Sequence, residues 1–119
     1  MDQRISQLVK FENLQKSPVS ITAEMVVDEK LPSFEGHFPG NPILPAVSII
    51  DISLYLLAQE YKEVSHTNIQ LKRSKFMAMV RPNQEVELSA ESDDEGKNWR
   101  VTWVLKENQS KLAQVHLII

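Results

Sequence analysis

The pattern of hydrophobic and polar residues along this 119-residue chain indicates one helix set among strands. Residues 46–61 carry apolar side chains on nearly every side, with Asp51 as the only charge before Glu60, which is typical of a buried helix. The flanking segments are rich in β-branched residues or alternate apolar with polar ones, which predicts strands. The predicted strands are residues 19–27, 69–80, 85–91, 99–106 and 111–119.

This order of elements fits a single α+β domain spanning residues 1–119. A helix that is apolar on all sides needs cover, and strands are the remaining elements that can supply it. We therefore expect an antiparallel β-sheet curled around one long central helix, in two layers. Trp99 and Trp103 share one face of a predicted strand, and we expect both to pack in the core rather than to bind a ligand.

The loop before the helix is conformationally restricted. Four of the six prolines and two of the three glycines lie between positions 32 and 45. Proline fixes φ and glycine permits turns that other residues resist, so this loop has a defined shape. It contains His37, whose side chain suits proton transfer at neutral pH, and Asp51 follows 14 positions later in the apolar helix. A base in such a loop and an acid in an apolar helix predict an active site.

Both residues also have a structural interpretation. His37 could fix the loop by hydrogen bonds to the backbone. Ser48 and Asp51 match the S-x-x-D pattern of a helix N-terminal capping box. Pro45 favours an earlier helix start, because proline is favoured at the first helical positions. This favours the catalytic interpretation of Asp51, and the proline- and glycine-rich motif around His37 favours it for His37.

The composition excludes several classes of function. Thirteen Lys and Arg against 16 Asp and Glu give a net charge of −3, which argues against a nucleic-acid surface or a polybasic membrane patch. Without cysteine, disulfides, thiolate metal sites and cysteine nucleophiles are excluded, and the histidines and acids match no common metal-binding spacing. The chain starts without an apolar signal sequence and contains no membrane-length apolar run, so we expect a cytoplasmic protein.

Residues 34–51 closely resemble the signature of the bacterial beta-hydroxyacyl-acyl-carrier-protein dehydratases of the FabA and FabZ type. The loop of that family reads approximately HFPG-x-P-[IV]-[ML]-P-G-V, and its second catalytic residue, Glu or Asp, follows the histidine by 14 positions, as Asp51 follows His37. Downstream, residues 75–76 and 80–83 are similar to the family's K-F and V-x-P-G-D elements, with Asn83 where glycine is usual. The resemblance covers residues 19–119 and is closer to the small ApeI-type dehydratases of aryl polyene gene clusters than to a housekeeping FabZ.

This resemblance implies a hot-dog fold and the elimination of water from a beta-hydroxyacyl thioester to give a trans-2-enoyl thioester. It implies that His37 removes the α proton and that Asp51 assists the leaving hydroxyl. The backbone N–H groups of Ala46 and Val47, at the positive end of the helix dipole, would polarise the thioester carbonyl. Gly40 is expected in the same substrate-binding segment. No cofactor is implied.

Two departures from the family pattern keep other functions open. Ala46 stands where the family has glycine, and Ile49 stands where FabZ-type proteins commonly carry glutamine. Ala46 adds a methyl group beside the expected thioester carbonyl but keeps its N–H. One alternative is a catalytically weak hot-dog subunit that binds an acyl chain or supports an active partner. A less favoured one is a hot-dog acyl thioesterase.

Two partners are expected. Lys72, Arg73 and Lys75 form a basic run that could receive an acyl carrier protein, although charged residues that guard an edge strand against pairing explain it about as well. A curled sheet leaves two open edges, which predicts a dimer of identical subunits, with a related hot-dog subunit as the alternative partner. In the resembled family the histidine and the acid of one site come from different subunits.

Overall fold

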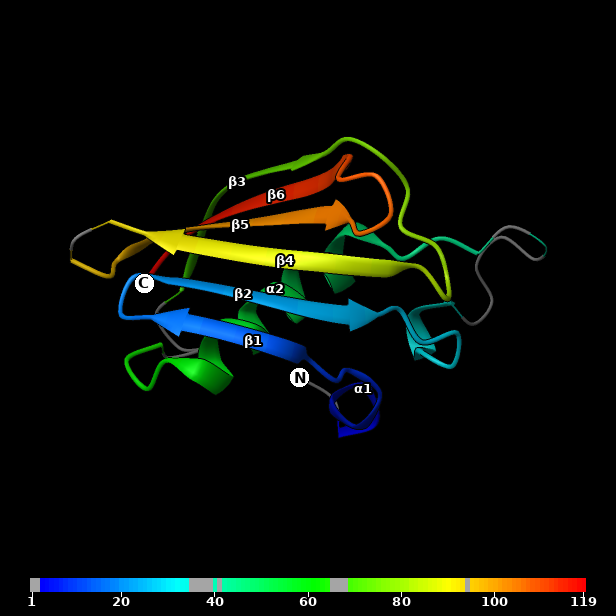
Figure 1. Ribbon diagram of the computed structural model, residues 1–119, viewed down its shortest axis with the longest axis horizontal. Helices are drawn as coiled ribbons and strands as arrows, with labels where there is room; N and C mark the ends of the chain where they lie inside the picture. The colour runs from blue at the N-terminus through cyan, green and yellow to red at the C-terminus, as the bar shows by residue number, and fades with distance from the viewer. Residues whose placement is uncertain (1–2, 35–39, 41, 65–68, 94) are drawn as a thin grey trace.

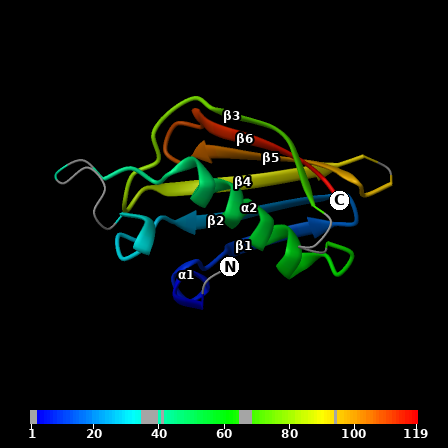
Figure 2. The same ribbon diagram turned by 180° about the vertical axis from the view of Figure 1, so that it is seen from behind.

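The computed structural model describes residues 3–34, 40, 42–64, 69–93 and 95–119. Within these ranges, six strands form one antiparallel sheet in the order β1-β2-β4-β5-β6-β3, and the long helix α2 lies across one face of it (Figures 1 and 2). This confirms the predicted α+β class. The elements are α1 (Gln3–Leu8), β1 (Glu12–Ser17), β2 (Ser20–Val26), the 3-10 helix η1 (Pro32–Phe34), α2 (Ala46–Glu60), β3 (Gln70–Phe76), β4 (Glu85–Ser92), β5 (Asn98–Leu105) and β6 (Lys111–Ile118).

Most predicted elements agree with the structure to within one or two residues, and the exceptions lie near the sheet edges. The strand predicted over residues 69–80 ends at Phe76 as β3. Beyond it, the amides of Met77 and Ala78 still donate to the Leu112 carbonyl, at 2.9 and 3.3 Å, but the chain then leaves the sheet. α1 and β1 were not predicted. β1 carries exposed side chains at nearly every position, so it lacks the alternation that marks a half-buried strand.

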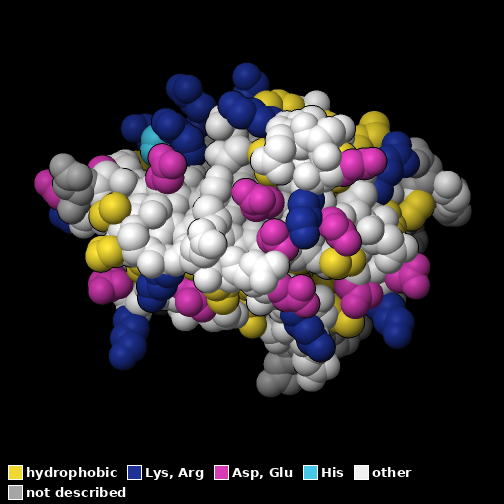
Figure 3. Space-filling view, viewed as in Figure 1, with side chains coloured by type: hydrophobic (Ala, Val, Ile, Leu, Met, Phe, Trp, Pro, Cys, Tyr) yellow, Lys and Arg dark blue, Asp and Glu magenta, His cyan; other side chains and the backbone are white. Residues whose placement is uncertain are grey.

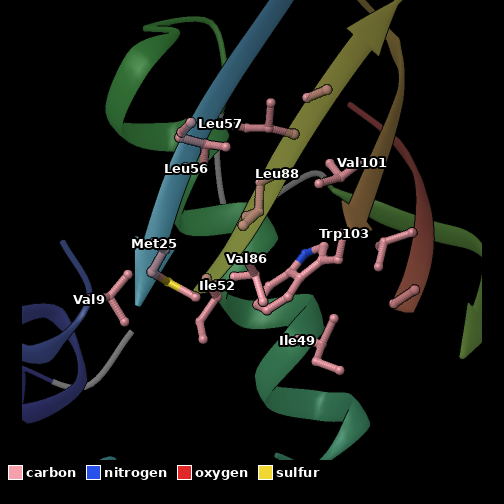
Figure 4. Packing of buried hydrophobic residues seen from close by; sticks show 14 of the residues in the cluster. Val9, Met25, Ile49, Ile52, Leu56, Leu57, Val86, Leu88, Val101 and Trp103 are labelled. Atoms are coloured by element: carbon pink, nitrogen blue, oxygen red, sulfur yellow. The ribbon is translucent and has the colours of Figure 1, made fainter. Parts of the chain in front are cut away.

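The core lies between the sheet and one side of α2 (Figure 4). Strands β2, β4, β5 and β6 bury alternate residues against the helix, as the period of two in a strand requires. Trp99 and Trp103 are 2% and 0% exposed, so the prediction that both pack in the core is confirmed. The helix side of this core consists of Ile49, Ile52, Leu56 and Leu57.

One buried serine connects the two layers. The Ser53 hydroxyl donates to the Ile49 carbonyl at 2.8 Å and accepts a hydrogen bond from Trp103 Nε1 at 2.9 Å. Both side chains are fully buried, and an unpaired polar group at this depth would be costly. Ser53 therefore satisfies the indole N–H of Trp103, one of the two largest core residues.

The sheet curls around one side of α2 and leaves the other side open within the described residues. Val47 is 63% exposed, and Asp51 is also exposed. Ile50 and Leu54 are half-buried, and these four positions share one face because residues three and four apart are neighbours on a helix. A largely apolar face of α2 is thus left open in a single chain.

The C-terminal end of α2 is attached to the β1–β2 hairpin. The hydroxyl of Tyr61 lies 2.8 Å from the carbonyl oxygens of both Ser17 and Ser20, and its ring packs against Trp99 with centroids 4.6 Å apart. Lys16 donates to the Glu60 carbonyl, and its ammonium lies 4.8 Å from the centre of the Tyr61 ring. These contacts fix the far end of the helix relative to the sheet.

Candidate active site

The segment before α2 is held to the rest of the fold at both ends. His37, the predicted base, lies outside the described residues. Before it, the amide of Phe34 donates to the Leu31 carbonyl at 3.0 Å, and both side chains are buried. After it, the amide of Leu44 donates to the Val80 carbonyl at 2.7 Å. The ends of the loop are therefore anchored in the core.

Gly40 has a φ of +88°, a conformation that residues with a side chain adopt rarely. A Cβ built at this position would meet nothing within 4 Å. Glycine is therefore favoured here by the backbone conformation rather than by lack of space. The backbone conformation thus gives a structural reason for glycine at position 40, in the segment expected to bind substrate.

The first turn of α2 begins with the backbone amides of Ala46 and Val47. The helix begins at Ala46 after Pro45, and the first amides that find acceptors are those of Ser48 and Ile49, both bonded to the Pro45 carbonyl. The amides of Ala46 and Val47 have no acceptor among the described residues, as expected for the first N–H groups of a helix. Both residues are exposed. Within the described ranges, two N–H groups at the positive end of the helix dipole are thus unpaired and suited to a carbonyl oxygen.

Asp51 lines a small recess on the same helix. Ser48, one turn before Asp51, and Ser33 from η1 are the other polar residues of the recess, and their hydroxyl oxygens lie 2.6 Å apart. The remaining walls are apolar: Ile5, Leu31, Leu44 and Ile52. The recess therefore joins one carboxyl group and two hydroxyl groups in an apolar surrounding.

The capping interpretation of Asp51 does not agree with the structure. A capping box would place Ser48 outside the helix as its N-cap residue. Ser48 instead lies within the first turn, the N-cap is Pro45, and there is no side-chain capping hydrogen bond. The acid is thus not needed to start the helix.

The predicted basic run forms part of a larger cluster, which we call the basic patch: Lys72, Arg73, Lys75, Arg100 and His116. In the sheet, Arg73 and Arg100 are both register partners of His116, on β3, β5 and β6. Neighbours of His116 on β6 are buried against α2, so the patch lies on the opposite face, where Figure 3 shows its basic side chains together. The structure therefore does not bring the basic run to the recess within one chain.

Arg100 and His116 were missed by the sequence prediction. The alternation of β6 places His116 on the outward face, which was visible in the sequence. The pairing of β3 with β6 was not visible in the sequence. Thirty-four residues lie between Phe76 and Lys111, and only the folded sheet makes these two strands neighbours. Burial, and next the charges of Lys72, Arg100 and Arg73, hold the pKa of His116 below its usual value. The imidazole is thus surrounded by cations.

Two findings concern metal and membrane. In the part of the chain that the structure describes, no group of three or more His, Asp or Glu side chains is arranged to hold a metal ion. Across the same ranges, no helix is long and apolar enough to span a bilayer.

Residues 13–115 match the protein family described as ApeI-like, ApeI dehydratase. The chain is also similar to curated FabZ proteins named 3-hydroxyacyl-[acyl-carrier-protein] dehydratase. One from Levilactobacillus brevis is 32% identical over 79 residues, which cover 61% of this chain and 52% of that protein, so the match spans about half of the relative. One from Rickettsia bellii is 26% identical over 103 residues, 80% of this chain and 71% of the relative.

Solved structures show the same fold. The dehydratase heterocomplex ApeI:P from Xenorhabdus doucetiae has a TM-score of 0.74 at 19% identity, with 92% of this chain and 96% of that chain covered. Zebrafish thioesterase superfamily member 2 has a TM-score of 0.64 at 16% identity, with 99% and 85% covered. At these identities the likeness establishes architecture, and the prediction of a hot-dog fold is confirmed.

Proposed function

Because this chain belongs to the ApeI-like dehydratase family, we propose that it eliminates water from a beta-hydroxyacyl group carried as a thioester on an acyl carrier protein, in fatty acid or aryl polyene type biosynthesis. One observation carries the proposal: the Ala46 and Val47 amides, which have no acceptor in the described part of the chain, and the carboxyl group of Asp51 lie on neighbouring turns of one helix. Thioester dehydration needs a carbonyl-polarising group and an acid, and this helix supplies both.

The proposed steps divide between three groups. The thioester carbonyl oxygen accepts hydrogen bonds from the Ala46 and Val47 amides, which stabilise the enolate-like charge that develops as the α proton leaves. His37 takes that proton. The electron pair of the broken Cα–H bond forms the double bond, the Cβ–O bond breaks, and the Asp51 carboxylic acid gives its proton to the leaving oxygen. The products are the trans-2-enoyl thioester and water.

The alanine at the head of the helix is compatible with this role. The side chain of Ala46 is exposed, and its amide has no acceptor among the described residues. In other enzymes, loss of one such donor costs about 2.7–4 kcal/mol of transition-state stabilisation. Retention of the N–H therefore matters more to the reaction than the added methyl group.

The basic patch and the β3 edge are the proposed partner surfaces. Among the described residues, none of the patch's Lys and Arg side chains forms a salt bridge, so their charges are available to an acidic carrier protein. The β3 edge and the segment after it expose Leu71, Phe76, Met77 and Met79. Together with the open face of α2, these side chains offer an apolar surface to a second hot-dog subunit.

The first test is direct. Purified protein incubated with beta-hydroxyacyl thioesters of several chain lengths should produce an enoyl absorbance. His37→Ala should abolish the signal, and Asp51→Asn should lower turnover by about 10²–10⁴-fold, the usual contribution of a positioned acid or base. The thermal unfolding midpoint of Asp51→Asn should stay near the wild-type value, because Asp51 is exposed. The same measurement on His37→Ala checks that this variant is folded.

Other outcomes would identify other functions. Release of free thiol without enoyl product would indicate a thioesterase. No turnover by the chain alone, with turnover restored by a related hot-dog subunit, would indicate the catalytically weak partner. Of these two alternatives, the open apolar face of α2 favours the catalytically weak partner subunit over the thioesterase.

A further inference from the structure

The hydroxyl groups of Ser33 and Ser48, which line the recess with Asp51, lie close together among apolar side chains. Ser48 is only 8% exposed and comes from α2, whereas Ser33 is half-buried and comes from η1. Their oxygens are 2.6 Å apart, which is a short hydrogen bond between neutral groups. Both line the same recess as the Asp51 carboxyl group.

This pair keeps hydrogen-bonding capacity that the protein does not use. Two hydroxyl groups carry two hydrogens, and the bond between Ser33 and Ser48 uses one of them. Neither hydroxyl has another partner among the described residues. One O–H and several lone pairs therefore remain for a third group in the recess.

The size of the recess limits which group can bind to the two hydroxyl groups there. Its volume is about 10 Å³, and a water molecule needs about 10–15 Å³ of such space together with two to four polar partners. Ser33, Ser48 and Asp51 supply three partners. Apolar side chains, including Ile5 of α1, form the other walls, and the exposed Asp51 lies at the solvent side of the recess. The recess fits one water molecule and is too small for an acyl group.

We propose that Ser48, supported by Ser33, binds the water molecule that leaves the substrate beside Asp51. This inference rests on the proposed dehydration. As the Cβ–O bond breaks, the leaving oxygen receives the Asp51 proton and becomes a neutral water, which the hydroxyl pair accepts by donating one hydrogen bond and receiving another. The pair thereby stabilises the departing group and fixes its position relative to the acid.

A purely structural role is the competing explanation, since the same hydrogen bond also links η1 to α2. Ser48→Ala removes the hydroxyl, and Ser48→Thr keeps it at the same position, so this matched pair separates the two roles. We expect kcat for enoyl formation to fall about tenfold in Ser48→Ala, the value of one hydrogen bond in the transition state. KM should stay near wild type, and the unfolding midpoint should fall only slightly, because the half-buried Ser33 hydroxyl can bind water instead. Ser48→Thr should recover most of the lost kcat.

Wild-type kcat in Ser48→Ala would overturn the inference, as would equal losses of kcat and stability in both variants. A second measurement does not depend on turnover. A crystal structure at high resolution should show an ordered water within about 3.2 Å of Ser48 Oγ and of the Asp51 carboxyl group, and that water should be displaced or absent in Ser48→Ala. If the wild-type chain is inactive, the proposed function fails, but the crystal structure still shows whether the recess binds water. A dry recess in a well-ordered wild-type crystal would rule the site out.

Discussion

At the scale of single residues, Ser53 shows how one side chain determines the cost of burying a large aromatic residue. Replacing it by alanine would leave Trp103 Nε1 without its acceptor in a fully buried position. We expect Ser53→Ala to lower the free energy of unfolding by about 1–3 kcal/mol, measured by urea denaturation. Adding Trp103→Gln or Trp103→Phe to this variant should show strong coupling between the two positions. A loss within about 0.5 kcal/mol, as for an ordinary surface change, would contradict this account.

Single-residue features differed in how far they were predictable. The burial of both tryptophans follows from their even spacing in a strand, and the αL conformation of Asn83 (φ 67°) agrees with its position where a turn glycine is usual. The bond between Ser53 and Trp103 was not predictable, because it depends on how α2 is rotated against β5. The same holds for Ser33 and Ser48, which come from two elements 15 positions apart in the chain.

At the scale of elements, the two faces of β3 differ in character: one is apolar and the other is basic. Residues that pair with buried β6 positions, such as Leu71 and Phe76, face the helix side, and Arg73 pairs with the outward His116. The bulge between Leu71 and Arg73 lets Lys72 join the outward charges. The sequence predicted the strand and its basic run. It did not predict that the run would lie across the sheet from the recess, since sheet order is not encoded in a local pattern.

The basic patch allows a selective test of carrier recognition. We expect Arg73→Glu to raise KM for a carrier-bound substrate severalfold and to leave KM for a small thioester surrogate unchanged. Added salt should weaken only the carrier reaction, because exposed charges are screened beyond about 8–10 Å at physiological ionic strength. Lys62→Glu, an exposed lysine after the end of α2, is the matched control. Equal effects on both substrates would indicate a damaged fold rather than a docking site.

At the scale of the whole molecule, the open face of α2 and the apolar β3 edge predict a dimer with two shared sites. His37→Ala and Asp51→Asn proteins, unfolded and refolded together, should form mixed dimers in which one of the two sites keeps both groups. Turnover should therefore reappear at up to about a quarter of the wild-type value if half of the dimers are mixed. Light scattering gives the assembly state. Monomers only, or no recovered turnover after proven subunit exchange, would exclude the shared site.

The attachment of Tyr61 to the β1–β2 hairpin has a consequence for the proposed reaction at the opposite end of α2. α2 has 15 residues and is therefore about 22 Å long, with its anchored end at Tyr61 and its free amides at the other end. A stiff rod of that length converts a tilt of about 3° at one end into a displacement of about 1 Å at the other. Misplacement by about 1 Å can reduce a rate by 10²-fold. We therefore expect the β1–β2 hairpin, through Tyr61, to determine where the Ala46 and Val47 amides lie relative to the proposed thioester substrate.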